Sequence, residues 1–396
     1  MGPTPVRERT ASDHIPRFTA PWPSGLAWAQ RSQIERWFAL AGPPGRFDLA
    51  RSGAPPRTTA DLLALASPED VDEYLSMSLD YGPGIGSDRL RTAISALTGA
   101  PSPAVIVTTG AVEALLLACA GALGPRLDVA VATPAYEGLL RAVEAAGGRA
   151  RPVRVWEPGA ERLDLAALAG LELSRYAAVL VNLPHNPTGL GADPAELADL
   201  ARRCGSARTA LIVDRVSAGT LDDGAGAQAE APGGGNALIV IGDVSKAFGL
   251  GGLRVGWCVT TNPERHARMC AVHDLTTLAA SGPSQHLAAI ALENRRALSV
   301  AAMARANRGR LVEWVASIPG GRLVPPADGL VAFPRIPMGS SSRPFAARLL
   351  ETRSVSVTPG SFFGHDDHLR LGLGLGPAQF DQALKLTAEA LGSRAA

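Results

Sequence analysis

The chain has 396 residues, of which 46% are hydrophobic and 19% are charged, and its formal net charge is +1. This length allows two domains, or one large domain with a smaller one attached to it. The small net charge excludes electrostatic attraction to nucleic acid or to an anionic membrane. No apolar stretch is long enough to span a bilayer, and the Pro- and Arg-rich first 23 residues lack the apolar core of a signal peptide. We therefore expect a cytoplasmic protein with neither a nucleic-acid nor a membrane partner.

The elements predicted along the chain alternate between strands and helices. The N-terminal 75 residues are rich in proline and predict an extended arm with one helix over residues 25–40. Strands are then predicted over 105–107, 129–132, 153–155, 178–182, 211–213, 238–241 and 255–259, and helices over 111–123, 137–146, 163–171 and 194–204. This alternation predicts an α/β fold with a large, mostly parallel sheet that is covered on both faces. Such a sheet binds its ligands beyond the carboxyl ends of its strands.

The later part of the chain has a different pattern of predicted elements. Residues 224–235 form a run of small residues that predicts a loop. After Pro283 a long helical pattern, broken near Asn294, runs to about residue 317. Short strands and helices alternate in the last hundred or so residues. This region is expected to form a smaller domain.

Metal and disulfide chemistry has little support in the sequence. The four cysteines are scattered without a CxxC pair, which indicates neither a disulfide framework nor a zinc site. The one metal-like spacing is the run from His365 to His368, and a polar loop before a final strand explains it equally well. We expect no metal.

The lysines carry the first chemical signal. Of the 38 basic residues only Lys246 and Lys385 are lysine. Lys385 lies in an amphipathic run over 379–391, where a solvated helix face accounts for it. Lys246 lies in a glycine-rich loop directly after the apolar run 237–241. Because a guanidinium cannot lose its proton in a protein, arginine cannot replace a lysine that must form an imine. Lys246 is therefore a candidate nucleophile.

A second signal is a site for an anion. The run 108–113 (TTGAVE) follows a predicted strand and opens a predicted helix, where backbone N–H groups face an anion. Arg254, flanked by glycines in the run 249–257, adds a charged partner, and Ser245 adds a hydroxyl group. Together these residues predict a phosphate site.

Three further residues indicate a planar, charged ring. Asp214 ends a predicted strand, and a buried carboxylate is costly unless a positive group pairs with it. In enzymes that use pyridoxal phosphate (PLP) this group is the protonated pyridine nitrogen. Asn186 ends the preceding strand, where it can donate to the phenolate oxygen of the ring or simply form an Asn-Pro turn. Tyr136 can stack on the ring or belong to the core.

Together these segments resemble the class I and II aminotransferases, which are PLP enzymes of fold type I. The resemblance covers about residue 47 to the C-terminus, and its most specific parts are NLPHNPTG at 182–189 and SKAFGLGGLRVGW at 245–257. The run FDLARSGAPP at 47–56 matches the N-terminal loop that closes over the substrate. It is most similar to the capreomycidine-synthase-type branch, which belongs to antibiotic biosynthesis. The resemblance implies an N-terminal arm with part of a small domain over 1–75, a large PLP-binding domain over 76–295 and the rest of a small α+β domain over 296–396.

The resemblance also implies a role for each site residue. Lys246 forms the Schiff base with PLP, Asp214 pairs with the pyridine nitrogen, and Asn186 binds the phenolate oxygen next to the substrate. The other expected cofactor contacts are Gly110, Ala111, Val112, Ser245 and Arg254 at the phosphate, and Tyr136 on the ring. The remaining expected contacts are Tyr81, which reaches the phosphate of a partner subunit in a homodimer, Arg370, which holds the α-carboxylate of an amino acid substrate, and Gly53 of the closing loop.

One position departs from the family pattern. Where the family has a tyrosine that donates to the phenolate oxygen, this chain has Ser217. We expect chemistry at the α-carbon through an external aldimine and a quinonoid, and the departure puts plain transamination in doubt. The reaction stays open between an ordinary aminotransferase, a C–S lyase and a decarboxylating or oxidative deaminase. The substrate stays open between an S-substituted cysteine and an arginine derivative.

Two other classes are disfavoured. The glycine-rich runs at 82–86 and 372–376 lack the spacing of a dinucleotide-binding loop. The segment before Phe47 is too short and too rich in proline to be the DNA-binding domain of a PLP-dependent transcription regulator. An enzyme is the favoured interpretation.

Overall fold

The computed structural model describes residues 32–40, 45–219 and 235–392. Of the predicted helix over 25–40, the described part forms α1 (Gln33–Leu40). The predicted small-residue loop at 224–235 lies outside the described residues except for Gly235.

A seven-stranded sheet forms the centre of the molecule, in the order β2-β8-β7-β6-β5-β3-β4. Its strands are β2 (Val105–Thr108), β3 (Asp128–Thr133), β4 (Arg149–Arg154), β5 (Ala178–Asn182), β6 (Ala210–Asp214), β7 (Leu238–Asp243) and β8 (Gly256–Val259). Only β8 runs antiparallel to its neighbours, β2 and β7. The predicted large and mostly parallel sheet is therefore confirmed, and the fold is α/β of fold type I.

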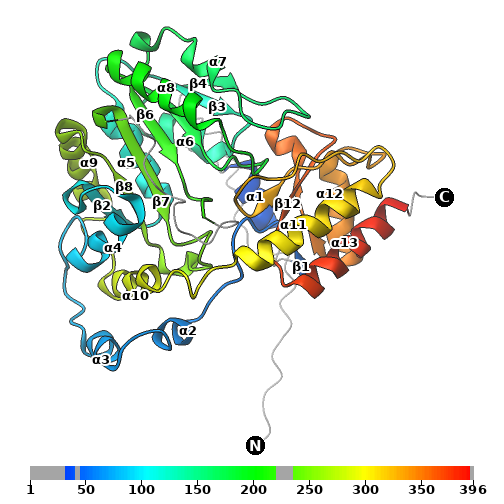
Figure 1. The fold of residues 1–396 in the computed structure, drawn as a ribbon, viewed down its shortest axis with the longest axis horizontal. Helices are drawn as coiled ribbons and strands as arrows, with labels where there is room; N and C mark the ends of the chain where they lie inside the picture. Colours follow the sequence, from blue (N-terminus) through cyan, green and yellow to red (C-terminus); the bar gives the residue numbers. More distant parts are fainter. Residues whose placement is uncertain (1–31, 41–44, 220–234, 393–396) are drawn as a thin grey trace, which may run out of the picture.

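Alternating residues along the strands divide the interior into two cores, because successive side chains of a strand point to opposite faces. Ile106, Leu180 and Ile212 face a core with α5 (Ala111–Ala122), α6 (Glu137–Ala145) and α9 (Pro263–Thr276). Their neighbours Val107 and Val181 face a core with α4 (Asp88–Thr98), α8 (Pro194–Ser206) and α10 (Gly282–Glu293). Helices thus cover both faces of the sheet (Figure 1). This burial explains why the central strands are continuously apolar.

Two elements differ from the prediction. The strand expected at 153–155 is β4, which begins at Arg149 and forms an edge of the sheet. Arg149 and Arg151 of this strand are exposed and bind Asp128 of the neighbouring strand. The strand therefore begins with charged residues and not with the apolar residues on which the prediction depended. The helix expected at 163–171 is only the single turn α7 (Ala166–Ala169).

A second, smaller unit combines segments from both ends of the chain (Figure 1). Phe47 and Leu49 share a core with Phe345 and Phe380. The strands of this unit are β1 (Phe47–Asp48), β9 (Val331–Ala332), β10 (Val355–Ser356), β11 (Thr358–Pro359) and β12 (Leu369–Gly372). Its helices are α11 (Ala301–Ala316), α12 (Ser342–Arg353) and α13 (Pro377–Gly392). The predicted helix break is present, since Asn294 ends α10. The domain limits at residues 75 and 296 stay predictions.

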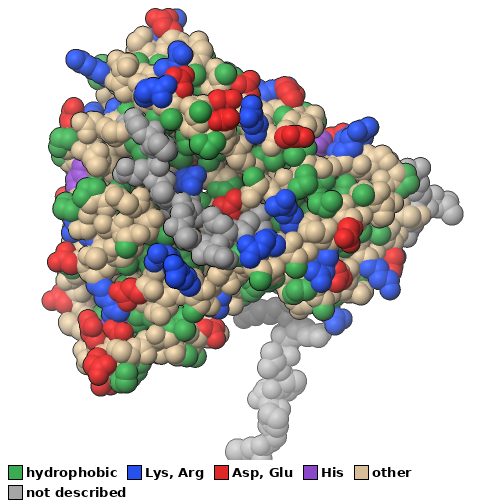
Figure 2. Space-filling model, viewed as in Figure 1, with side chains coloured by type: hydrophobic (Ala, Val, Ile, Leu, Met, Phe, Trp, Pro, Cys, Tyr) green, Lys and Arg blue, Asp and Glu red, His purple; other side chains and the backbone are tan. Residues whose placement is uncertain are grey.

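The surface seen in Figure 2 has acidic and basic side chains interspersed. None of the described helices is both long enough and apolar enough to cross a bilayer.

Candidate active site

Lys246 lies in the loop that follows β7, at the carboxyl end of the sheet. The segment 47–56 lies directly on this lysine: Ala54 N donates to Lys246 O at 2.8 Å, and a Cβ added to Gly53 would lie 3.3 Å from Lys246 Cα. Gly53 therefore lies against the nucleophile, and its predicted contact with the substrate stays a prediction. Desolvation lowers the pKa of the Lys246 ammonium, although the nearby Asp243 opposes this change. A lowered pKa favours the neutral amine that attacks a carbonyl.

Asp214 ends β6, the fourth of the seven strands in the sheet. Burial raises the pKa of its carboxyl group to about 6, although a hydrogen bond from Val216 N to Oδ1 (3.0 Å) favours the charged form. The charge of Asp243 raises this pKa further, and the positive charge of Lys246 lowers it. A partly buried carboxylate in this state favours a cationic ligand, and a protonated pyridine nitrogen fits it.

The phosphate cradle depends on glycine. Arg254 has a left-handed backbone (φ 52°), and its guanidinium lies against the turn between β2 and α5. A Cβ on Gly110 would lie 2.2 Å from Arg254 Nη2, and a Cβ on Gly256 would lie 2.6 Å from Ala111 N. Any larger residue at these positions would displace the guanidinium or the first amide of α5. The predicted grouping of Arg254 with Gly110 and Ala111 is present, and it fits a phosphate group.

Arg370 on β12 is the second cationic group of the site, and its side chain is buried. Nη2 donates to Ala50 O (2.8 Å) and to Thr358 Oγ1 (3.0 Å), and Nη1 donates to Asn186 Oδ1 (3.2 Å). Nε has no hydrogen-bond partner, and no carboxylate among the described residues forms an ion pair with this guanidinium. Burial lowers the pKa of Arg370 to about 10, so it stays charged at neutral pH. A buried cation without an anion fits the α-carboxylate of a substrate.

Asn186 links the two halves of the site. Because its Oδ1 accepts from Arg370, its amide N–H groups remain available to the phenolate oxygen of a bound ring. Asn186 N donates to Asn182 Oδ1 at 2.7 Å, and Asn182 Nδ2 donates to Asp214 O at 3.2 Å. Asn182 therefore fixes the ends of β5 and β6 relative to each other. The sequence did not predict this role for Asn182, although Asn182 is the first residue of the motif at 182–189.

Tyr136 precedes α6, and its ring packs against Gly138 of that helix. A Cβ on Gly138 would lie 2.2 Å from Cε1 of the Tyr136 ring. Its hydroxyl group donates to Glu35 Oε1 at 3.0 Å. Burial, followed by the charge of Glu35, raises the pKa of Tyr136 well above its ordinary value. Glu35 belongs to α1, which the sequence predicted only as a helix, with no link to the site.

A cavity of about 320 Å³ joins α1 to the catalytic groups. Lys246 and Arg370 line it together with Trp37, Phe38 and Asp48. The aromatic pair comes from α1, and Asp48 comes from the loop that the resemblance places over the substrate. This cavity is the best candidate for the substrate pocket.

Asp243 is a second residue that sequence reasoning missed. It is buried at the end of β7, and its carboxylate accepts from Ser245 N (2.9 Å) and from Ser245 Oγ (2.5 Å). The Ser245 hydroxyl, which the sequence predicts at the phosphate, therefore donates to a carboxylate in this structure. An acidic residue three positions before the candidate nucleophile was the available signal.

Three predicted residues have side chains that form no hydrogen bond with this group, although Val112, predicted through its backbone amide, directly follows Ala111 in α5. Tyr81 is 83% exposed, and the Val112 side chain is 67% exposed at the start of α5. Ser217 is buried after β6 next to Gly329 and Pro184, and its hydroxyl group forms no hydrogen bond with a described residue. Their predicted contacts with the cofactor stay predictions.

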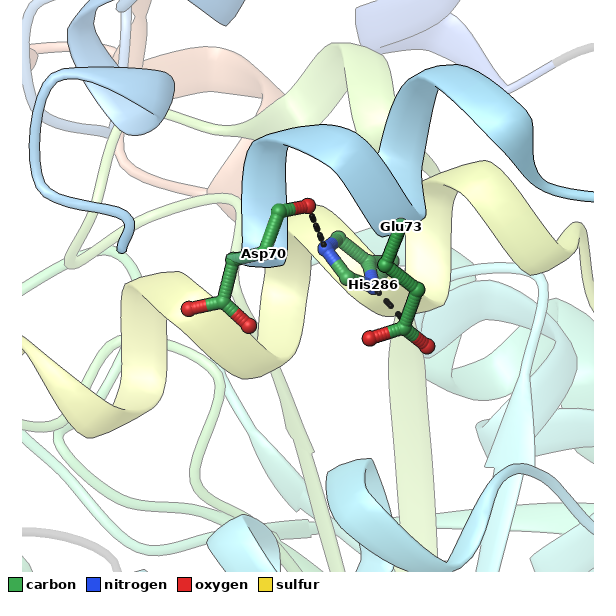
Figure 3. A group of neighbouring side chains, drawn as sticks. All are labelled: Asp70, Glu73 and His286. Carbon is green, nitrogen blue, oxygen red and sulfur yellow. Dashed lines mark hydrogen bonds and ion pairs between the residues drawn. The ribbon is translucent and has the colours of Figure 1, made fainter. Parts of the chain in front are cut away.

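The possible metal ligands are explained by packing. Among the described residues one group, Asp70, Glu73 and His286, has donor atoms within 4.8 Å of one another. It joins α3 (Pro68–Ser76) to α10, with the His286 ring bonded to Asp70 O, while the Asp70 carboxylate points away from the ring and binds Arg89 (Figure 3). His368 is buried, bonds to Asp367 and stacks on Phe333.

Comparisons with known proteins agree with this geometry. The sequence profile described as aminotransferase class I and II matches residues 66–386. Capreomycidine synthase from Streptomyces vinaceus is 32% identical over 95% of this chain and 98% of its own length, and arginine–pyruvate transaminase from Pseudomonas aeruginosa is 31% identical over 71% and 73%. The crystal structure of the PLP-dependent cyclase OrfR superposes with a TM-score of 0.81 at 29% identity, over 92% of this chain and 98% of that one. The chain therefore belongs to the class I and II aminotransferase family, and it is a PLP-dependent enzyme of fold type I.

Proposed function

We propose that this enzyme acts at the α-carbon of an amino acid with a positively charged side chain, in specialised metabolism. The observation that carries the proposal is Glu35. Its carboxylate accepts from Tyr136 and forms no ion pair with any described residue, yet it acts electrostatically on both Lys246 and Arg370. Glu35 lies on α1, the helix that supplies Trp37 and Phe38 to the cavity, and an acidic group on this helix favours a substrate cation and disfavours a second substrate carboxylate.

Asp48 is the acidic residue in the lining of the cavity, and its carboxylate is already bound within its own segment. Asp48 accepts from Ala50 N and Arg51 N at 3.1 Å, and its second oxygen lies 3.5 Å from Arg51 Nε. Glu35 is therefore the group that the proposal assigns to the substrate side chain. One relative, the arginine–pyruvate transaminase, has a cationic amino acid in its name, which supports the same substrate class.

The chain supplies the remaining parts of the mechanism. Bound PLP supplies an electron sink for negative charge at the α-carbon. Lys246 Nζ, whose pKa is lowered by desolvation, would accept the α-proton, and the Asp214 carboxylate would keep a bound pyridine nitrogen protonated. Arg370 orients the α-carboxylate and therefore the bond to be broken. Trp37, Phe38 and the segment 47–56 exclude water from the reacting atoms.

Two candidate functions differ in the reaction that follows loss of the α-proton. Ser217 in place of the family tyrosine favours chemistry other than transamination. The likeness to a synthase and a cyclase supports the same candidate. An ordinary aminotransferase that forms a keto acid is the alternative, supported by the arginine–pyruvate transaminase.

A substrate screen tests this proposal. Arginine, lysine and ornithine are compared with the neutral arginine analogue citrulline and with an S-substituted cysteine. The readouts are the cofactor spectrum and analysis for keto acid, ammonia, thiol and cyclic products. We expect a spectral change and product with the cationic amino acids and much weaker responses with citrulline. Efficient turnover of the S-substituted cysteine would contradict the substrate class.

We further propose that the enzyme is a cytoplasmic homodimer with shared active sites. The residues Leu79, Tyr81 and Leu275 are 83–87% exposed. They come from adjoining segments, since a Cβ on Gly84 would lie 3.4 Å from Leu278 O. Burial of this apolar surface against a second copy would bring Tyr81 to the partner's phosphate site. Sedimentation is expected to show a dimer, and an active monomer would contradict the proposal.

A further inference from the structure

We propose that the amino end of the central sheet binds a phosphoryl anion. This end lies opposite the carboxyl end of the sheet, where the active site is. A cavity of about 410 Å³ opens beside the amino ends of β3, β5, β6 and β7. Four arginines line it, Arg126, Arg208, Arg265 and Arg268, and the one carboxylate of its lining belongs to Glu264. The cavity shares no lining residue with those next to Lys246.

The arginine charges are poorly neutralised. Arg126 donates to Ser174 O and Thr209 Oγ1 at 3.1 and 3.2 Å, and Arg265, which is 8% exposed, donates to Asn236 O at 2.6 Å. These acceptors satisfy N–H groups but supply no negative charge. Of the four, only Arg268 forms an ion pair with a described residue, Glu264, at 3.3 Å. Burial and the charges of Arg268 and Arg126 lower the pKa of Arg265, which agrees with mutual repulsion around the cavity.

The chemistry of the lining indicates which anion binds. Arginine binds phosphate oxygens through paired N–H groups, and several guanidinium groups around one cavity suit a multiply charged group. Arg268 Nε is buried without a hydrogen-bond partner. The amino end of the 14-residue helix α9, capped by Asn262, also lines the cavity and adds partial positive charge. A phosphoryl group, either as free phosphate or on a small metabolite, fits these donors.

Helix α5 connects this cavity to the cofactor. It begins at Ala111, directly after Gly110 of the phosphate cradle, and ends at Ala122, which lines the cavity. Arg268 donates to Leu123 O at 2.8 Å, directly after the helix. Met269 packs so closely that a Cβ on Gly121 would lie 2.4 Å from its Cγ. An anion that holds Arg268 would therefore also stabilise α5.

Calorimetric titration of the PLP-loaded enzyme with inorganic phosphate, pyrophosphate and ATP tests the site. We expect saturable binding of at least one of them, together with a rise in the melting temperature. Binding of inorganic phosphate would identify the free ion, and binding of ATP alone would identify a phosphorylated metabolite. Arg208→Gln is the main variant because the Arg208 side chain forms no hydrogen bond or ion pair with a described residue, so the fold should persist. It should weaken binding roughly tenfold or more, since it removes a charge-assisted contact.

A second variant and a control complete the test. Arg265→Gln should weaken binding further. Arg202→Gln removes an arginine of α8 that pairs with Asp199 outside the cavity, and it should bind like the wild type. Absence of saturable binding to any of the three ligands would overturn the proposal. Unchanged binding by both cavity variants, or an equal loss in Arg202→Gln, would do the same.

Discussion

The cofactor half and the substrate half of the active site are built in different ways. The cofactor half consists of Gly110, Asp214, Lys246 and Arg254, all at strand ends or adjoining turns of one sheet. The substrate half combines α1, the segment 47–56 and Arg370 of β12, which are distant in the sequence. The first half is fixed by local strand-to-loop geometry. The second depends on how the two ends of the chain fold together, and this is where specificity can change without loss of the cofactor.

The largest expected effect concerns the cofactor half. Lys246→Ala should abolish activity and the borohydride-reducible link between PLP and the protein, because no other side chain replaces the amine at this position. Lys385→Ala is the matched control, since these are the only two lysines of the chain. Mass spectrometry of the reduced protein locates the link. A reduced link that persists in Lys246→Ala would break the assignment of the nucleophile.

Arg370→Ala tests the substrate half and should have the next largest effect. Loss of a guanidinium–carboxylate contact should raise KM for the amino acid roughly ten- to hundredfold, while PLP affinity changes little. Steady-state kinetics and a PLP titration measure the two quantities. Arg370→Lys retains the charge without the fork and should lie between the variant and the wild type. Equal losses of PLP and substrate affinity would show that the two halves are not separable in this way.

Asp214 links the cofactor half to the stability of the apoprotein. Its pKa of about 6 lies above the ordinary 3.8, so its stabilising contribution is present at low pH and is lost as the pH rises through about 6. At about 1.4 kcal/mol per pH unit, the difference amounts to about 3 kcal/mol. Asp214→Asn should therefore stabilise the apoprotein relative to the wild type at pH 8 and much less at pH 4, while it weakens PLP binding. Denaturant unfolding of both apoproteins at the two pH values measures this, and a pH-independent difference would contradict it.

The sequence predicts the two halves unequally. Lys246, Asp214 and Arg254 were predictable because each lies at or near the end of a recognisable strand, so a short pattern also gives its place in the fold. The proposed role of Glu35 was not predictable from the sequence. It depends on the docking of an eight-residue helix against Tyr136, which is about a hundred residues away in the chain. Asp243 was overlooked because a carboxylate beside the phosphate-binding segment has no simple role there. Tyr81 points away from its own chain, so its predicted role depends on a second copy.

Ser217 should give a smaller effect. A tyrosine at this position would donate to the phenolate oxygen, so Ser217→Tyr should lower the pKa of the PLP–lysine linkage by roughly one unit, the equivalent of one hydrogen bond. The pH dependence of the visible absorption band measures it. Ser217→Ala is the control and should leave this pKa close to that of the wild type. An unchanged pKa in Ser217→Tyr, with rapid keto-acid formation by the wild type, would place the enzyme with the ordinary aminotransferases.

The central claim is that the substrate half selects a cationic side chain through Glu35. Glu35→Gln removes the charge and retains an oxygen that can accept from Tyr136. The most direct measurement is kcat/KM for arginine and for citrulline, in the wild type and in this variant. We expect a fall of roughly tenfold or more for arginine and little change for citrulline, because only arginine loses a charge partner. An equal fall for both amino acids, or an unchanged preference for arginine, would contradict it.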